Sequence, residues 1–395
     1  MRKLTVISLE QALSLPYATE RMAQLGWRVI RIESPAGDPN RRIGLPIGGP
    51  DRCAYYVGPN AGKESVVLDL LSPLGQRALH RIVSALQPDI FCCNTLPGRY
   101  ERLGIDPSTL GRLRPGLIWA AISAMGPDFP DVPGYDPALQ AQLGFMELTG
   151  PADGPPMLSG VPFVDLKAGD ELFTQVMTAL WERAESGDRP FEKRIDVSMA
   201  RAAASWLLTV VPMLDAGARP EELTRSGSEH RHFVPSNAYP TSDGFVYLAI
   251  GSDRQWAQLV SLRAFESLAV PMLQTNAGRK EHRRELHERI GACTRSRSTE
   301  LNLEDLRRAN IVCAPIFSVG QAIEQRWIRP LLYQTRAPDG RRIRLPPSAV
   351  ELPGGTELPF PPKHGEHTEQ ILREARLDDR EVEEILSGRG KQDPR

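Results

Sequence analysis

The chain has 395 residues, of which 41% are hydrophobic and 25% are charged, so it can bury a core for one large domain or two. A net charge of -1 gives no whole-protein field that would attract nucleic acid. The sequence also contains no run of about 18 apolar residues, the length that a membrane-spanning helix needs. We therefore expect neither partner. The five cysteines contain no CxxC pair, which indicates reduced thiols and a cytoplasmic setting.

Strand and helix patterns alternate in the first half of the chain. In chain order, the sequence predicts a strand at 4–9, a helix at 17–25, strands at 28–33 and 65–69, a helix at 73–86 starting near Ser72, a strand at 90–93, helical pieces at 99–103 and 107–113, and a strand at 117–123. Strand–helix–strand units at this spacing form parallel sheets. The expected fold class is therefore α/β, with a Rossmann-like large domain.

The second half of the chain changes pattern near Leu223. The sequence predicts a long helix at 171–183, a strand at 195–197, an apolar helix at 200–214, a strand at 245–251, helices at 255–262, 280–295 and 303–308, a strand at 311–316, a proline-rich extended passage at 345–362, and helices at 367–375 and 380–387. We expect a large domain made of residues 1–205 and 340–395, and a small α/β domain with linkers at 206–339.

The common cofactor and metal motifs are missing from the sequence. No GxGxxG follows the first predicted strand, and Gly58–Lys63 is one residue short of a P-loop, with Glu64 where Ser or Thr is needed. None of the seven histidines forms HExxH, and there is no GxSxG. We expect no metal and no permanently bound cofactor.

Asp165 is the most conspicuous carboxylate in the sequence because it lies in an otherwise apolar and small-residue run, 159–169. A carboxylate at the end of an apolar element, with glycines nearby, is a candidate nucleophile or base. Spacing alone favours the interpretation that Asp165 caps the following helix, a role that Asp170 could also fill. Both interpretations stay open at this point.

Basic residues follow several predicted strands or open predicted helices, and these are Arg41, Arg42, Lys63, Arg99 and Arg102. In an open α/β sheet the ligand crevice lies at the carboxyl ends of the strands. Arginine there suits recognition of phosphate and pyrophosphate. Together these residues permit a phosphorylated ligand.

Motifs along nearly the whole chain resemble those of the family III CoA-transferases, which include formyl-CoA transferase, carnitine CoA-transferase and α-methylacyl-CoA racemase. They occur in the family's order and comprise residues 15–19 (LPYAT, with Leu15 in place of glycine), 25–38, 60–70, 97–104, 133–142, 196–199, 243–246 and 365–368. Each motif is weak alone, and their order makes the resemblance specific.

The resemblance implies that Asp165 attacks an acyl-CoA thioester, forming a mixed anhydride and then an aspartyl-CoA thioester. It implies that CoA, bound as substrate, contacts Gln11, Arg41, Arg42, Leu68, Asn94, Thr95, Arg102, Leu103, Tyr135, Asp136 and Met199. The implied substrates are succinyl-CoA or a similar thioester and a small carboxylic acid, with a dicarboxylate suggested by Arg41. The implied assembly is an interlocked, ring-like homodimer.

Departures from the family pattern bear on the choice of activity. Racemases of the family have a histidine where this chain has Tyr135, which is a poor base near neutral pH. We therefore favour transfer, with 2-methylacyl-CoA racemisation or non-catalytic CoA binding as alternatives. Gln11 and Leu13 replace the histidine and glutamine that formyl-CoA transferase has in its first loop, which argues against oxalate as the acceptor acid. Ser34 and Pro35 replace a basic residue, and the segment 249–252 is poorer in glycine than the family's mobile loop.

Overall fold

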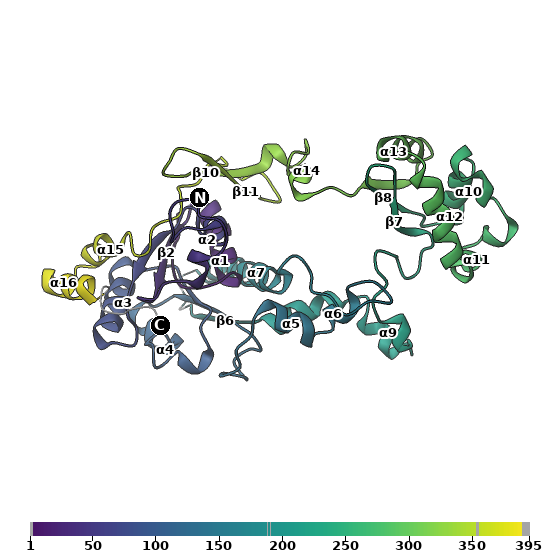
Figure 1. Cartoon of the computed structure of the whole chain (residues 1–395). Coiled ribbons are helices and arrows are strands. Elements are labelled where there is room, and N and C mark those ends of the chain that lie inside the picture. The colour runs from purple at the N-terminus through teal and green to yellow at the C-terminus, as the bar shows by residue number, and fades with distance from the viewer. Residues whose placement is uncertain (1–2, 188, 190, 353–354, 389–395) are drawn as a thin grey trace. The chain divides into compact units, whose positions relative to one another are not determined.

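The structure is a computed structural model that describes residues 3–187, 189, 191–352 and 355–388. The chain forms two compact units (Figure 1). The first comprises Met1–Leu143, Ser159–Thr209 and Pro330–Arg395, and the second comprises Gly144–Leu158 and Val210–Arg329. Among the described helices, none is long and apolar enough to cross a membrane.

A six-stranded sheet forms the centre of the first unit, and each neighbouring pair of strands is parallel. In the order β3-β2-β1-β4-β5-β6, the strands are Glu64–Val67, Arg28–Glu33, Thr5–Leu9, Ile90–Cys93, Ile118–Ser123 and Lys193–Ser198. Ile7 of β1 lies between Ile30 of β2 and Phe91 of β4. The strand order reverses between β1 and β4, and ligands bind at such switch points in doubly wound folds. The predicted parallel α/β sheet is confirmed.

One face of the sheet packs against four helices, α3 (Pro73–Leu86), α4 (Pro107–Leu113), α15 (Thr368–Glu374) and α16 (Asp379–Gly388). Ile7 and Phe91 from the sheet and Leu79 and Leu372 from the helices belong to one buried cluster. Each such side chain contributes roughly 1.5–3 kcal/mol on burial. The predicted start of α3 is confirmed, since the Ser72 hydroxyl accepts the Gly75 N–H at 3.0 Å.

The opposite face carries α1 (Ser14–Gln24) and α7 (Phe163–Ser186), which pack closely on each other. A Cβ atom on Gly169 of α7 would lie 2.6 Å from the Ser14 carbonyl oxygen and 2.8 Å from Tyr17 Cδ1. Such distances are too short for real contacts, so only glycine allows this approach. Asp165 lies one helical turn before Gly169, and the crossing therefore brings the start of α1 beside it.

The helix that carries Asp165 begins earlier than predicted, at Phe163 rather than at residue 171. The interpretation of Asp165 as an N-cap is wrong, because Pro162 holds that position and Asp165 is the third helical residue. Asp170 is not the cap either, since it lies inside the helix. The sequence was misleading because the carboxylate that accepts the first N–H groups of α7 comes from Asp136, a residue far away in the chain.

The single helix predicted at 200–214 is also wrong. This segment instead forms α8 (Met199–Ala204), the 3-10 turn η3 (Ser205–Leu207) and α9 (Val211–Asp215). Pro212 lies in the first turn of α9, where its missing N–H costs nothing, but it could not continue a helix from α8. Other elements of the first unit that the sequence did not indicate are α2 (Ala54–Asn60), α5 (Asp136–Gln142), and the antiparallel pair β10 (Leu332–Arg336) and β11 (Arg342–Pro347).

The second unit is built on an antiparallel sheet with the order β7-β8-β9, whose strands are Ser236–Pro240, Phe245–Ala249 and Val312–Pro315. Its helices are α6 (Phe145–Leu148), α9, α10 (Asp253–Val260), α11 (Asn276–Glu281), α12 (Arg283–Arg295), α13 (Thr299–Arg308) and α14 (Val319–Ile323). Val246 and Leu248 of β8 share a separate buried core with Trp256, Ile290 and Leu306 from the helices.

The 3-10 turns of the two units not yet named are Pro39–Arg42, Pro97–Arg99, Pro220–Glu222, Arg263–Leu268, Pro271–Leu273 and Arg329–Leu331.

Candidate active site

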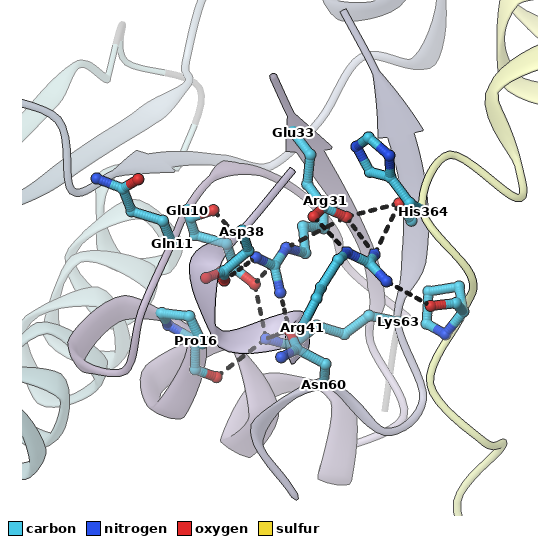
Figure 2. A network of polar contacts seen from close by, with 12 residues as sticks. Glu10, Gln11, Pro16, Arg31, Glu33, Asp38, Arg41, Asn60, Lys63 and His364 are labelled. Carbon is cyan, nitrogen blue, oxygen red and sulfur yellow. Dashed lines mark hydrogen bonds and ion pairs between the residues drawn. The ribbon is translucent and has the colours of Figure 1, made fainter. Parts of the chain in front are cut away.

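Two residues predicted to contact CoA meet at the switch point of the sheet. Gln11 follows β1 and Asn94 follows β4. The Gln11 N–H donates to Asn94 Oδ1 at 3.1 Å, and Asn94 Nδ2 donates to the Gln11 carbonyl oxygen at 2.8 Å. The Gln11 side chain is exposed, and in Figure 2 it points away from the neighbouring charged network.

The turn after Gln11 is held in an unusual conformation. Ala12 has φ +59°, a left-handed value that is uncommon for residues other than glycine. Its N–H donates to both oxygens of Asp38, at 3.3 and 3.2 Å, and its carbonyl oxygen accepts from Asn40 Nδ2 at 3.0 Å. These contacts fix the backbone path from β1 into α1, and so fix where the first residues of α1 lie.

Asp165 is half-buried in the first turn of α7, which lies beside the start of α1. Burial and the nearby Asp136 carboxylate raise the pKa of Asp165 to about 7, and the Ser14 hydroxyl opposes that rise. A carboxylate with this pKa is more basic and more nucleophilic than an ordinary one, yet it is still substantially ionised at neutral pH.

Asp136, also predicted from the resemblance, is buried at the start of α5 and holds three segments together. Its Oδ2 accepts the backbone N–H groups of Val164 and Asp165, at 2.8 and 3.2 Å. Its Oδ1 accepts from Gln140 Nε2 at 2.6 Å, and Gln140 Oε1 in turn accepts the Ser159 N–H at 3.1 Å. Asp136 therefore ties the start of α7 to α5 and, through Gln140, to the segment at Ser159.

A cluster of buried charges lies between the sheet and the first turns of α1 (Figure 2). Arg31 of β2 is fully buried and donates to Asp38, while its Nε lies 3.9 Å from Glu10 Oε1 and 3.7 Å from Glu33 Oε1. Burial alone would raise the pKa of Glu33, but Arg31 and Arg41 lower it to about 2. The cluster is therefore a set of compensated ions, and it supports the Ala12 turn through Asp38.

Arg41, predicted to hold a CoA phosphate, is part of this buried cluster. It donates to Glu33 at 2.8 and 2.6 Å, to the Tyr56 hydroxyl at 2.6 Å and to the Pro362 carbonyl oxygen at 3.1 Å. Its guanidinium also stacks on the Tyr56 ring at 3.9 Å from the centroid. These contacts occupy its edges and one face, so the structure gives Arg41 a role in packing and not at an open phosphate site.

Lys63 is also part of this buried cluster, although the sequence placed it among the basic residues that could bind a phosphate. It is buried, and its Nζ donates to Glu10 at 2.7 Å, to Thr19 Oγ1 at 2.7 Å and to the Pro16 carbonyl oxygen at 3.0 Å. Thr19 and Pro16 belong to α1. Lys63 therefore anchors the first turns of α1.

The other predicted contacts are dispersed over the first unit. Arg42 and Arg102 are exposed cations, Thr95 is half-buried after β4, and Tyr135 is 74% exposed. Leu68 lies inside the hydrophobic core and Leu103 packs against it. Met199 is buried at the start of α8. Among these residues, Arg42 and Arg102 are the exposed cations that remain candidates for phosphate contacts.

Ser14 is the site residue that the sequence did not indicate. The predicted helix began at Tyr17, so Ser14 was assigned to the preceding turn. A serine next to a helix start usually satisfies its own backbone. Nothing in the local pattern shows that Ser14 lies beside another helix, because its position depends on the α1–α7 crossing at Gly169.

The segment compared with a mobile glycine loop lies in the second unit. After β8, the Gly251 N–H donates to Gln255 Oε1 at 2.7 Å and the Ser252 hydroxyl accepts the Gln255 N–H at 3.3 Å. These two bonds fold the segment onto α10. A surface cavity there is lined by Gly251, Ser252, Arg254, Gln255, Gln258 and Asn310.

Glu20 of α1 is a second buried carboxyl group with a raised pKa. Burial raises it from 4.5 to about 7, although Lys63, Gln24 and Arg21 oppose the rise. A pKa above the unfolded value means that ionising Glu20 costs folding free energy as pH rises from about 4.5 through 7. We expect Glu20→Gln to raise the free energy of unfolding by about 2–3 kcal/mol at pH 8 and by far less at pH 4.5, as measured by urea unfolding.

The matched control for Glu20 is Glu374, whose carboxylate accepts from Arg28 at 2.6 and 2.7 Å. Those hydrogen bonds lower the pKa of Glu374. Its ionised form therefore stabilises the fold above about pH 4.5, so Glu374→Gln should destabilise the protein at pH 8. Equal effects of Glu20→Gln at both pH values would contradict the assignment of a buried, reluctantly ionised Glu20.

Comparison with known proteins gives a consistent result across the chain. The profile of CoA-transferase family III matches residues 1–368. A succinate–glutarate CoA-transferase of Agrobacterium fabrum is 32% identical, covering 93% of this chain and 94% of the relative. Succinyl-CoA:glutarate CoA-transferase of Mus musculus is 28% identical, covering 96% and 88%. The crystal structure of a CaiB/BaiF family protein from Brucella suis matches with a TM-score of 0.82 at 26% identity, covering 94% and 98%. This chain belongs to CoA-transferase family III.

Proposed function

We propose that this chain moves CoA from succinyl-CoA, or a similar acyl-CoA, to a small dicarboxylate, with Asp165 as the nucleophile. The observation that carries the proposal is the setting of Asp165 beside the switch point of the sheet, with a pKa raised to about 7 by burial and Asp136. The names of the relatives from Agrobacterium fabrum and Mus musculus, which pair succinyl groups with glutarate, support a dicarboxylate acceptor.

The chemistry proceeds as an exchange of activated acyl groups. An oxygen of Asp165 bonds to the thioester carbon, and the carbon–sulfur bond breaks to release CoA as thiolate. The thiolate then bonds to Cγ of Asp165, and the donor acid leaves as its carboxylate. The acceptor carboxylate reverses this sequence, attacking the aspartyl thioester and receiving CoA. Each step exchanges one activated acyl group for another, so the reaction requires no ATP.

The CoA binding that we propose uses the loops at the carboxyl edge of the sheet. Gln11, Asn94 and Thr95 lie after β1 and β4, and the exposed Arg42 and Arg102 supply positive charge for phosphates. We leave Arg41 out of this set because Glu33 and Tyr56 already engage it.

The assembly that we propose is an interlocked homodimer. Large apolar side chains are exposed on the single chain, including Leu45 (79%), Trp181 (64%), Leu208 (76%), Val319 (80%) and Trp327 (62%). A soluble monomer rarely exposes so many, and burial against a second copy would remove them from water. Light scattering coupled to gel filtration should give twice the monomer mass.

The test of the activity is an exchange screen with trapping. Succinyl-CoA is incubated with isotopically labelled succinate, glutarate or other acids, and the CoA esters are measured by mass spectrometry. Hydroxylamine added during turnover should modify Asp165, which peptide mapping locates. Deuterium uptake at the α-carbon of a 2-methylacyl-CoA without a second acid would instead indicate racemisation. Binding of CoA with neither reaction would indicate a non-catalytic protein.

A further inference from the structure

Gln140 is a buried side chain of α5, and its amide links two segments of the first unit. Only 1% of its surface is exposed. Its Nε2 donates to Asp136 Oδ1 at 2.6 Å, and its Oε1 accepts the Ser159 N–H at 3.1 Å. The backbone N–H of Ser159 can only donate, so the amide oxygen must face it and the NH₂ group must face Asp136. Gln140 therefore joins Asp136 to the segment that runs into α7.

The bond between Gln140 and Ser159 connects two parts of the first unit that are separated along the chain. The chain leaves this unit after Leu143 and re-enters it at Ser159. The helix α7 begins soon afterwards, at Phe163. The bond therefore fixes the backbone just before the helix that carries the proposed nucleophile.

The first N–H groups of α7 depend on Asp136 for an acceptor. Pro162, at the N-cap, supplies no side-chain hydrogen bond. The N–H groups of Val164 and Asp165 donate instead to Asp136 Oδ2, at 2.8 and 3.2 Å. A helix start without such an acceptor leaves its N–H groups unsatisfied and frays. Because Asp165 lies in that first turn, loss of the acceptor would release its carboxyl group, while the later turns of this 24-residue helix would stay packed.

We propose that Gln140 is a positioning residue for the reacting carboxyl group: it holds Asp136 in the orientation that caps α7, and so fixes the turn that carries Asp165. This role rests on the proposed function, in which Asp165 attacks the thioester. Gln140 acts only through Asp136 and transfers no proton. A reacting group displaced by about 1 Å can lose about 10²-fold in rate, so a hydrogen bond away from the reacting atoms is sufficient for a large effect.

An amide suits this position because one end donates and the other accepts. Methionine and glutamate have side chains close in length to that of glutamine, which makes them suitable replacements. Methionine would form neither hydrogen bond. An ionised glutamate would accept the Ser159 N–H and place a second carboxylate against Asp136, whereas a protonated glutamate would donate to Asp136 as the amide does. The two replacements therefore separate the loss of both bonds from the loss of the donor alone.

The charged groups near this contact lie on the two helices that it joins and on α1. They are Asp136 on α5, Asp165, Lys167, Asp170 and Glu171 in the first turns of α7, and Arg21 on α1. Lys167 is paired with Glu171 at 3.0 Å, and Asp170 is paired with Arg21. A carboxylate at residue 140 would thus add negative charge beside Asp136, and both that charge and burial favour its protonated form.

The first test compares Gln140→Met and Gln140→Glu in labelled exchange between succinyl-CoA and glutarate. Gln140→Met should lower kcat by about 10²-fold and change KM for the acyl-CoA little. Its acid limb of kcat/KM should move to lower pH, since burial and Asp136 raise the pKa of Asp165 and a loosened turn weakens both effects. Gln140→Glu should be equally slow at pH 8.5, and its rate relative to the wild-type chain should rise as the pH falls to 5.5.

The second test uses hydrogen exchange and does not require activity. In Gln140→Met the amides of Val164 and Asp165 should exchange faster, whereas the rest of α7 should keep its protection. The matched control is Asn302→Leu, which removes a buried amide of the second unit that donates to the Thr294 carbonyl oxygen at 3.0 Å. It should lower stability and leave both the acid limb and the hydrogen exchange at the start of α7 unchanged.

A Gln140→Met chain with wild-type kcat, acid limb and hydrogen exchange would overturn the proposal for Gln140. Equal changes in Gln140→Met and Asn302→Leu would do the same, because they would reflect stability alone. Should Gln140→Met fail to fold, Gln140→Glu decides, and a constant rate relative to the wild-type chain from pH 8.5 to 5.5 would count against the proposal. Failure of hydroxylamine to trap Asp165 in the wild-type chain would instead overturn the proposed function, and the hydrogen-exchange result would still test what Gln140 does to this turn.

Discussion

Asp165→Asn should be inactive in CoA exchange and, at pH 8, more stable than the wild-type chain. The amide cannot form the mixed anhydride, so we expect exchange to fall by at least about 10³-fold. Burial and Asp136 raise the pKa of Asp165 from 3.8 to about 7, so its ionised form costs folding free energy that grows between those values. Removing that cost should raise the free energy of unfolding at pH 8 by about 2–4 kcal/mol.

The measurements are labelled exchange at saturating substrates and urea unfolding at pH 4 and pH 8. Near pH 4 the wild-type carboxyl group is mostly protonated in the folded chain, so the gain in stability should nearly vanish there. Asp170→Asn is the matched control, because Asp170 lies five residues later on α7 and pairs with Arg21. It should retain exchange activity. An active Asp165→Asn, or one destabilised at pH 8, would mean that Asp165 has a structural role only.

Arg31→Met should have the largest effect on stability. It removes the fully buried guanidinium that donates to Asp38 and lies within 4.0 Å of Glu10 and Glu33. Breaking a buried ion pair on one side typically costs about 3–5 kcal/mol, since the remaining charge is left without compensation. Activity should fall as well, because Asp38 then loses the partner that holds it against the Ala12 turn.

The cost of Arg31→Met should depend on pH. In the wild-type chain, Arg31 and Arg41 outweigh burial and lower the pKa of Glu33 to about 2. Without Arg31, the buried carboxylates can relieve their repulsion by taking up a proton, so destabilisation should be smaller at pH 5 than at pH 8. Arg28→Met is the control on the same strand, since Arg28 makes partly exposed pairs with Glu64 and Glu374. Arg28→Met should lower the free energy of unfolding by at most about 1 kcal/mol. A similar loss for both variants would contradict the idea that Arg31 stabilises the fold by compensating the buried carboxylates.

Local sequence patterns were sufficient for several regular elements of the first unit. The helix at Pro73–Leu86 and the strands at Arg28–Glu33 and Ile90–Cys93 follow from apolar periodicity and from the Ser72 and Pro73 start signal. They were predictable because each buries a face whose spacing is visible in a short window. The start of α7 was not, because its first N–H groups are capped by Asp136 from another segment.

The sequence by itself determined the parallel α/β sheet and the family, and it singled out Asp165 as the carboxylate that we propose to react. Only the tertiary structure decided what the polar residues around it do. Arg41 and Lys63 look in sequence like any exposed cation, yet both are buried against carboxylates, and the start of α1 is brought against α7 at Gly169. The physical reason is that charge compensation and hydrogen-bond direction depend on contacts between distant segments, whereas strand and helix periodicity is local.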